Sequence, residues 1–173
     1  LPYAPYVPDL SAVTVSRVGK NLTTAKEVYN GAYKYLETVV DGRNCIRFTS
    51  GTTLKNTPIT FEPNTQYTAS FYAKSENFNG ATSDNNGATF FYSDGTRSHV
   101  KVGRDSTDWA LYTLTSGRGK TVTHIGVYTQ EYRAHVYLDT DTFQLEIGAV
   151  ATDYEPYSAQ TATPSADGTV DGI

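Results

Sequence analysis

Tyrosine is the residue type in this sequence whose placement points most directly to a ligand chemistry. The chain holds 14 Tyr against 7 Phe and 1 Trp, and each phenol combines a flat ring with a hydroxyl. Strand alternation turns Tyr72, Tyr128 and Tyr137 away from the apolar residues of their segments. A pyranose stacks its C–H face on such rings and needs polar partners for its hydroxyls. These tyrosines therefore predict a saccharide-binding face, or else they complete a sandwich, because alternation identifies the face but not the sheet.

Three further side chains are candidates for the same face. His124 alternates with Ile125 and lies on the same side of its segment as Tyr128, and Arg97 alternates with apolar residues in a second segment. Both offer planar hydrogen-bonding groups. Trp109, the sole tryptophan, is a candidate sugar platform, but it shares a face with Leu111, and this pattern favours a core or rim position.

Signatures of catalysis are absent from the sequence. It contains no G-x-S-x-G, H-E-x-x-H, Walker or C-x-x-C motif. Most acidic residues fall in expected turns, where they serve as turn formers. The three histidines lie in separate predicted strands, which disfavours a zinc site. A glycan hydrolase, whose paired carboxylates need only be close in space, is the third and least favoured hypothesis.

One acidic stretch suggests a metal. Asp139 and Asp141, in L-D-T-D-T-F-Q-L-E, lie at the end of one predicted strand and before the next. Their carboxylates are hard oxygen ligands of the kind that Ca²⁺ prefers. The stretch lacks the glycine and spacing of an EF-hand. The pair therefore predicts a structural calcium site.

Composition excludes several other classes. The net charge is −4 with no basic block, which disfavours nucleic-acid binding. No apolar run reaches the roughly 18 residues of a membrane span. Cys45 is the single cysteine, has no internal disulfide partner and reads as a small buried hydrophobe. The chain starts at Leu1 and lacks methionine, so we expect an excised fragment or a processed product.

Short alternating segments separated by turn signals organise the sequence, and none shows a sustained helical period. Asp41-Gly42 and Asp94-Gly95 predict hairpin turns. The stretch 21–32 allows a short helix, but its glycine and tyrosines favour a structured loop. The fold class predicted is all-β, a two-sheet antiparallel β-sandwich. Strands are expected over Ser11–Val18, Tyr35–Val40, Asn44–Thr49, Phe61–Lys74, Ala88–Tyr92, Arg97–Val102, Trp109–Thr115, Thr121–Gln130, Ala134–Leu138 and Phe143–Ile147.

The two ends differ in composition from the middle. Residues 1–10 hold three prolines and predict an extended lead-in, residues 11–157 form the module, and residues 158–173 are polar and small, as in a linker. Y-A-P-Y at 3–6 is matched by Y-E-P-Y at 154–157. The match suggests a string of modules, each closing on the same junction peptide.

Three stretches carry a family resemblance. The closing Q-L-E-I-G-A-V-A-T-D-Y-E-P-Y, the strand E-P-N-T-Q-Y-T-A-S-F-Y-A-K-S and the opening V-G-K-N-L resemble jelly-roll, carbohydrate-binding-module-like domains of phage and prophage tail proteins from Gram-positive bacteria. The resemblance implies a jelly roll that serves as an accessory glycan-binding or spacer module. Related modules hold structural calcium with an Asp in a Y-x-D strand, which Asp139 matches, although the T-D-T-F that follows departs from their pattern. No sugar-site motif carries over.

These observations lead to two main hypotheses. The first is a non-catalytic carbohydrate-binding module of a phage tail or surface adhesion protein, located on a virion or cell surface, whose partner is host polysaccharide. The second is a spacer or assembly module of the same particle, whose partners are neighbouring modules or tail proteins and which has no glycan site.

Overall fold

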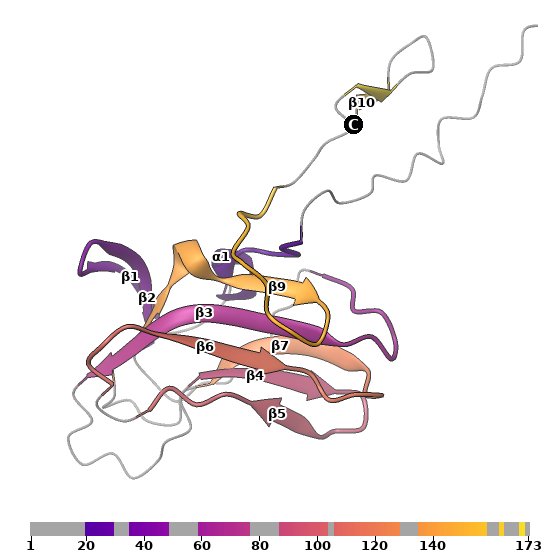
Figure 1. Cartoon of the computed structure of the whole chain (residues 1–173), viewed down its shortest axis with the longest axis horizontal. Helices are drawn as coiled ribbons and strands as arrows, with labels where there is room; N and C mark the ends of the chain where they lie inside the picture. Colours follow the sequence, from indigo (N-terminus) through magenta and orange to yellow (C-terminus); the bar gives the residue numbers. More distant parts are fainter. Residues whose placement is uncertain are drawn as a thin grey trace, which may run out of the picture.

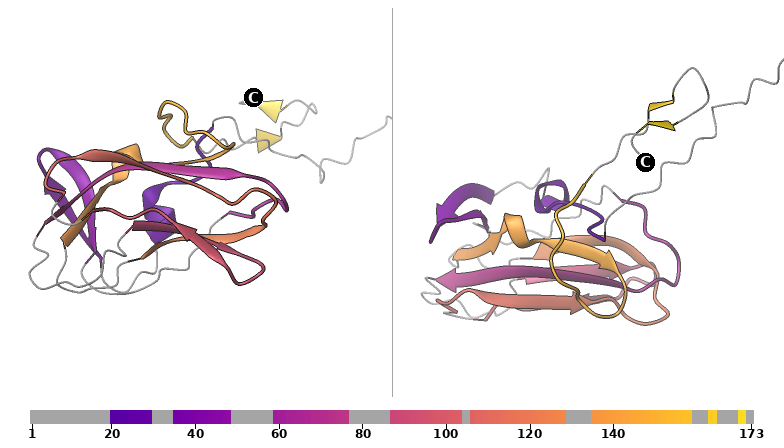
Figure 2. Two further views of the ribbon diagram at one scale, coloured as in Figure 1. Left: turned by 60° about the horizontal axis from the view of Figure 1, so that its bottom comes forward. Right: turned by 45° about the horizontal axis from the view of Figure 1, so that its top comes forward.

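Strand pairing divides the protein into two antiparallel sheets that stack face to face (Figure 1, Figure 2). The computed structural model describes residues 20–29, 35–48, 59–76, 87–103, 106–128, 135–158, 163–164 and 170–171. The larger sheet has the order β1 (Tyr35–Val40), β2 (Arg43–Phe48), β8 (His135–Asp139), β3 (Tyr67–Glu76) and β6 (Ala110–Thr115), with β9 (Gln144–Ile147) also paired to β3. The smaller sheet has the order β5 (Arg97–His99), β4 (Gly87–Tyr92) and β7 (Val122–Tyr128).

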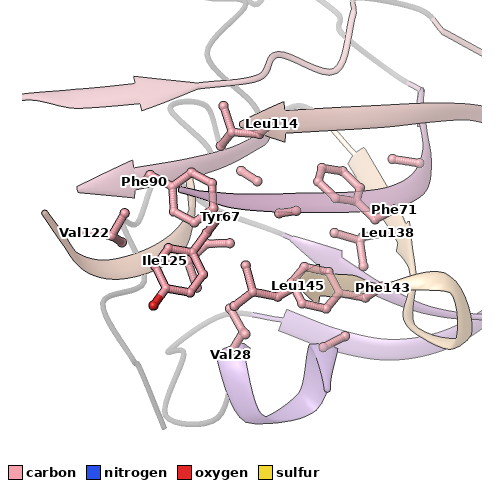
Figure 3. Packing of buried hydrophobic residues seen from close by; sticks show 14 of the residues in the cluster. Val28, Tyr67, Phe71, Phe90, Leu114, Val122, Ile125, Leu138, Phe143 and Leu145 are labelled. Carbon is pink, nitrogen blue, oxygen red and sulfur yellow. The ribbon is translucent and has the colours of Figure 1, made fainter. Parts of the chain in front are cut away.

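The core lies between the two sheets and follows the alternation of the sequence (Figure 3). Phe71 of β3 and Leu138 of β8 meet Phe90 and Ile125 of the smaller sheet's strands in one cluster of buried residues. Full burial of each such side chain contributes on the order of 1.5–3 kcal/mol to the free energy of folding. The predicted all-β, two-sheet antiparallel sandwich is confirmed, and the chain passes repeatedly from one sheet to the other, as in a jelly roll.

The β1–β2 hairpin is the turn that matters most for the site. Asp41 and Gly42 both have positive φ, 52° and 79°, and Val40 pairs with Arg43 across them. Positive φ at both central residues is the signature of a tight two-residue hairpin, for which Asp-Gly is favoured. The turn therefore fixes the register of Arg43 and brings Asp41 to the tip.

The stretch 21–32 contains a helix, and the preference for a loop there was wrong. The helix α1 (Ala25–Tyr29) starts after Thr24, whose hydroxyl accepts from the Glu27 amide at 3.1 Å. The Glu27 carboxylate accepts in return from the Thr24 amide at 3.1 Å. This reciprocal pair is a capping box, and Val28 anchors the helix in the core.

The segment 148–157, here called the closing segment, folds back over the outer face of the larger sheet (orange in Figure 1). Gln144 and Glu146 point outward from β9 but are buried. The Glu146 carboxylate accepts from the Thr152 amide at 2.8 Å and the Thr152 hydroxyl at 2.7 Å. The Gln144 side-chain oxygen accepts from the Glu155 amide at 2.7 Å. The closing segment thus covers the β9 half of this face.

Several predictions concern the ends of the chain. The lead-in over residues 1–10 and the strand over Ser11–Val18 lie outside the described residues. Within the predicted linker, β10 (Thr163–Pro164) and β11 (Val170–Asp171) pair with each other and with neither sheet. Among the residues that the structure describes, no helix is long and apolar enough to span a membrane.

Acid should weaken the attachment of the closing segment through Glu146. Burial opposes the charged carboxylate, but the hydrogen bonds from Thr152 and Gln144 outweigh it and lower the pKa of Glu146 below its ordinary 4.5. Its stabilising contribution is complete above that ordinary value and is lost as pH falls through the lowered one. We expect Glu146→Gln to be less stable at neutral pH and to lose less further stability in acid, as measured by urea unfolding against pH. The control is Glu62→Gln, an exposed position. Equal acid dependence in Glu146→Gln and the parent would contradict the assignment.

Candidate functional site

The part of the larger sheet's outer face formed by β2, β8 and the end of β3 holds a group of aromatic and charged side chains. Tyr72 and Lys74 extend from β3, and Tyr137 and Asp139 from β8, with Lys74 directly opposite Tyr137 in the register. Arg43 belongs to the adjoining β2, and Asp41 and Trp109 lie in loops at its margin. We call Asp41, Arg43, Tyr72, Lys74, Trp109, Tyr137 and Asp139 the outer-face cluster.

Arg43 connects the aromatic and acidic parts of the cluster. Its Nη1 donates to Oδ2 of Asp139 at 2.6 Å, and Asp139 is only 2% exposed. Its guanidinium carbon lies 5.2 Å from the Tyr72 ring centroid and 5.1 Å from that of Trp109. Both separations are within cation–π range. The guanidinium therefore neutralises a buried carboxylate and fixes two rings at the same time.

Asp41 forms a second junction at the tip of the β1–β2 hairpin. Its Oδ2 accepts from Lys74 Nζ at 2.7 Å and from Trp109 Nε1 at 3.0 Å. These bonds lower the pKa of Asp41, while the Asp41 partner raises the pKa of the largely buried Lys74. Both groups stay charged at neutral pH. The exposed carboxylate thus determines where the Trp109 indole lies.

The accessible aromatic surface comes from two of the three rings. Tyr72 and Trp109 are half-buried, whereas Tyr137 is 8% exposed. Lys74 Nζ lies 5.6 Å from the Trp109 centroid and 6.0 Å from the Tyr137 centroid. Tyr137 is therefore a buried packing partner of Lys74, and Tyr72 and Trp109 present ring surface to a ligand.

The predicted site residues fall on two different sheets. Tyr72, Tyr137 and Trp109 come together, as described. Arg97, His124 and Tyr128 belong to β5 and β7 of the smaller sheet, where the His124 ring stacks on Phe91 at 4.3 Å. The expected face with Tyr72, Tyr128 and Tyr137 together does not form, because their strands belong to two sheets and alternation along a strand does not reveal which sheet it joins.

Sequence reasoning left Arg43 and Asp41 out of the site. Asp41 was recognised as a turn former, and the Asp-Gly signal does locate both residues at a hairpin tip. Their role depends on Trp109 and Asp139, which follow 68 and 96 residues later in the sequence. No local pattern reports contacts over such separations.

The calcium expectation does not fit the residues present. Asp139 Oδ2 accepts from Arg43, and Oδ1 accepts from the Asp141 amide at 3.0 Å. Asp141 is the middle residue of the 3₁₀ turn η2 (Thr140–Thr142), and its Oδ2 accepts from Asn44 Nδ2 at 2.7 Å. Within the described ranges, no three His, Cys, Asp or Glu side chains converge as a cation cage. A guanidinium occupies the position at Asp139 where a cation would bind.

No family model and no curated protein sequence matches the chain. Solved structures similar to it include a "Family 16 Carbohydrate Binding Module-2", with 13% identity and a TM-score of 0.43 over 66% of this chain and 86% of that one. The CBM22-1 xylan-binding domain of Paenibacillus barcinonensis Xyn10C is 18% identical, with a TM-score of 0.41. The match covers 70% of this chain and 85% of that domain. A carbohydrate-binding module of Cellvibrio mixtus lichenase 5A, in complex with cellotriose, is 12% identical, with a TM-score of 0.41. The match covers 76% of this chain and 98% of that module. Likeness at this level concerns strand arrangement and assigns no residue a role.

Removal of the Arg43 guanidinium should be strongly destabilising. Arg43→Ala would leave the Asp139 carboxylate buried and without its ion pair, which typically costs about 3–5 kcal/mol. We expect a loss of that size in the free energy of unfolding measured in urea. Lys120→Ala, which breaks the exposed pair with Asp94, should have a much smaller effect because water screens such pairs. Comparable losses in the two variants would show that Asp139 does not depend on Arg43.

Proposed function

We propose that this chain is a non-catalytic module that binds a neutral saccharide on the outer-face cluster. The observation that carries the proposal is the placement of Tyr72 and Trp109, two half-buried rings fixed around one guanidinium. A pyranose would stack its apolar face on the exposed part of these rings. Its hydroxyls would donate to the exposed Asp41 carboxylate and accept from Arg43, which is partly exposed.

The charges of the cluster favour an uncharged ligand. The two cations, Arg43 and Lys74, are each ion-paired with carboxylates of Asp41, Glu76 or Asp139. Because both cations are already paired with carboxylates, neither offers an unneutralised charge that would attract a uronate or phosphate. Hydroxyl groups both donate and accept, so they suit ion-paired side chains that offer both functions.

The same pairing argues against hydrolysis. A glycosidase needs one carboxyl group that is protonated near neutral pH to serve as general acid. Hydrogen bonds from Lys74 and Trp109 lower the pKa of Asp41, which keeps it ionised. Asp139 is committed to Arg43. The arrangement of the cluster therefore supports binding without bond cleavage.

The biological setting that we propose is a phage tail or a surface adhesion protein, on a virion or outside the cell. The support is the resemblance of the central and closing strands to jelly-roll modules of tail proteins. The partner would be a polysaccharide on the host surface. A shallow site leaves little net affinity after ordering costs, and repetition of the module on a particle would compensate through effective concentration.

A spacer or assembly module is the second candidate. The observation that favours it is that Arg43 already contacts both exposed rings and Asp41 already accepts from Trp109. Side chains whose polar groups are already paired with one another would then stabilise the sandwich and need no ligand. In that case the partners would be neighbouring modules, and the outer-face cluster would bind no glycan.

A glycan array with neutral and acidic polysaccharides, including Gram-positive cell-wall material, tests the proposal. We expect binding to neutral glycans only, reduced by about tenfold or more in Trp109→Ala and in Tyr72→Ala because each removes a stacking ring. Trp109→Phe should retain most binding, since it keeps a ring.

The matched control is His99→Ala, which changes an exposed side chain on the smaller sheet and should bind like the parent. Thermal melting checks that each variant is folded. Absence of binding to every glycan would favour the spacer function. Binding that persists in both ring variants, or that prefers acidic glycans, would show that the outer-face cluster is not the site.

A further inference from the structure

Two hollows flank the turn η2, and Lys26 of α1 lines both of them. One, of about 440 Å³, lies toward the β1–β2 hairpin, and the other, of about 600 Å³, lies toward the closing segment. Lys26, Thr140 and Asp141 line both, so we treat them as one feature, the η2 groove. Each volume is within the range of about 300–1,000 Å³ typical of small-ligand sites.

The floor of the η2 groove carries fixed polar groups. Asp141 Oδ2 accepts from Asn44 Nδ2 at 2.7 Å, and the Thr140 hydroxyl donates to the Asn44 carbonyl at 3.0 Å. Both Asn44 and Asp141 are exposed. These bonds hold a carboxylate and an amide side by side in fixed directions. Little conformational entropy of these side chains is therefore lost when a ligand binds.

The wall of the η2 groove toward the closing segment is aromatic. Tyr154 and Tyr157 line the second hollow together with Pro156, and Tyr154 is 44% exposed. Burial, followed by the nearby Asp141 and Asp139 carboxylates, raises the pKa of Tyr154, so its hydroxyl keeps its proton and can donate. The backbone beside this ring is fixed by the bond from the Glu155 amide to Gln144.

The Lys20–Glu155 ion pair, at 3.0 Å, adds a second attachment to the same backbone. Tyr154 therefore projects from an anchored segment and is still 44% exposed. An exposed ring on a fixed backbone loses little freedom when a ligand covers it.

The η2 groove adjoins the outer-face cluster but is lined by different side chains. Arg43 and Asp139 point to the outer face, where they pair with each other, whereas Asn44 and Asp141 line the hollows at the sheet edge. Of the charged side chains in the groove, Lys26 is paired with Glu37 at 3.6 Å, and Asp141 adds a further negative charge. An anionic ligand is therefore disfavoured here as well.

We propose that the η2 groove is a second saccharide subsite, in which a neutral pyranose stacks on Tyr154 while Asp141, which lines the same hollow and is held by Asn44, binds its hydroxyls. The chemistry needed is the same as at the outer-face cluster, namely an aromatic plane beside planar polar groups. The two sites share no side chain. One chain would then bind a glycan at two points, which increases avidity when both are occupied by one polymer.

The test is an amide NMR titration of the whole chain with methyl β-glucopyranoside, methyl β-galactopyranoside and N-acetylglucosamine at millimolar concentrations. We expect saturable shifts at Asn44, Thr140, Asp141 and Tyr154 with at least one of these sugars. The shifts should disappear in Tyr154→Ala and Asp141→Ala. They should remain in Tyr154→Phe, which keeps the ring, and in Asp153→Asn, an exposed neighbour outside the hollows.

Trp109→Ala separates this proposal from the function proposed above. If the η2 groove binds sugar by itself, its shifts persist in Trp109→Ala whether or not the outer-face cluster binds. Shifts at the groove residues that vanish in Trp109→Ala would overturn an independent subsite. So would the absence of shifts at the η2 residues with all three sugars, even if residues of the outer-face cluster respond.

Discussion

The ion pair between Arg43 and the buried Asp139 is the interaction on which the candidate site depends. A carboxylate that is 2% exposed is costly unless a cation neutralises it, so the fold requires a guanidinium at this point. Once Arg43 is held there, its guanidinium lies within cation–π distance of Tyr72 and Trp109. The rings are thereby ordered before any ligand arrives, and binding loses less conformational entropy as a result.

The closing segment decides which part of the larger sheet is available. Its bonds to Gln144 and Glu146 bury the outward side chains of β9, while the neighbouring part of β3 and β8 carries the outer-face cluster. The same segment presents Tyr154 to the η2 groove. One stretch of about ten residues thus separates two surfaces that have similar chemistry but belong to different sides of β2 and β8.

Much of the fold is predictable from local sequence, and most of the site is not. The two-residue turn at Asp41-Gly42 and the alternation of β3 follow from backbone conformation and burial, and both agree with the structure. The capping box of α1 was present in T-A-K-E but was outweighed by the nearby glycine and tyrosines. Tyr128 was grouped with Tyr72 and Tyr137, but the β4–β7 pairing places its strand in the smaller sheet, and parity says nothing of sheet membership. The Arg43–Asp139 contact likewise depends on tertiary structure alone.

Trp109 fluorescence tests the central claim most directly, because Trp109 is the sole tryptophan and its indole belongs to the outer-face cluster. The account predicts a saturable change in intensity and a shift of emission to shorter wavelength as a neutral oligosaccharide displaces water from the ring. An emission spectrum that stays unchanged while the same oligosaccharide demonstrably binds the chain would contradict it. The sugar would then be bound elsewhere, and the cluster around Arg43 would be part of the framework of the sandwich.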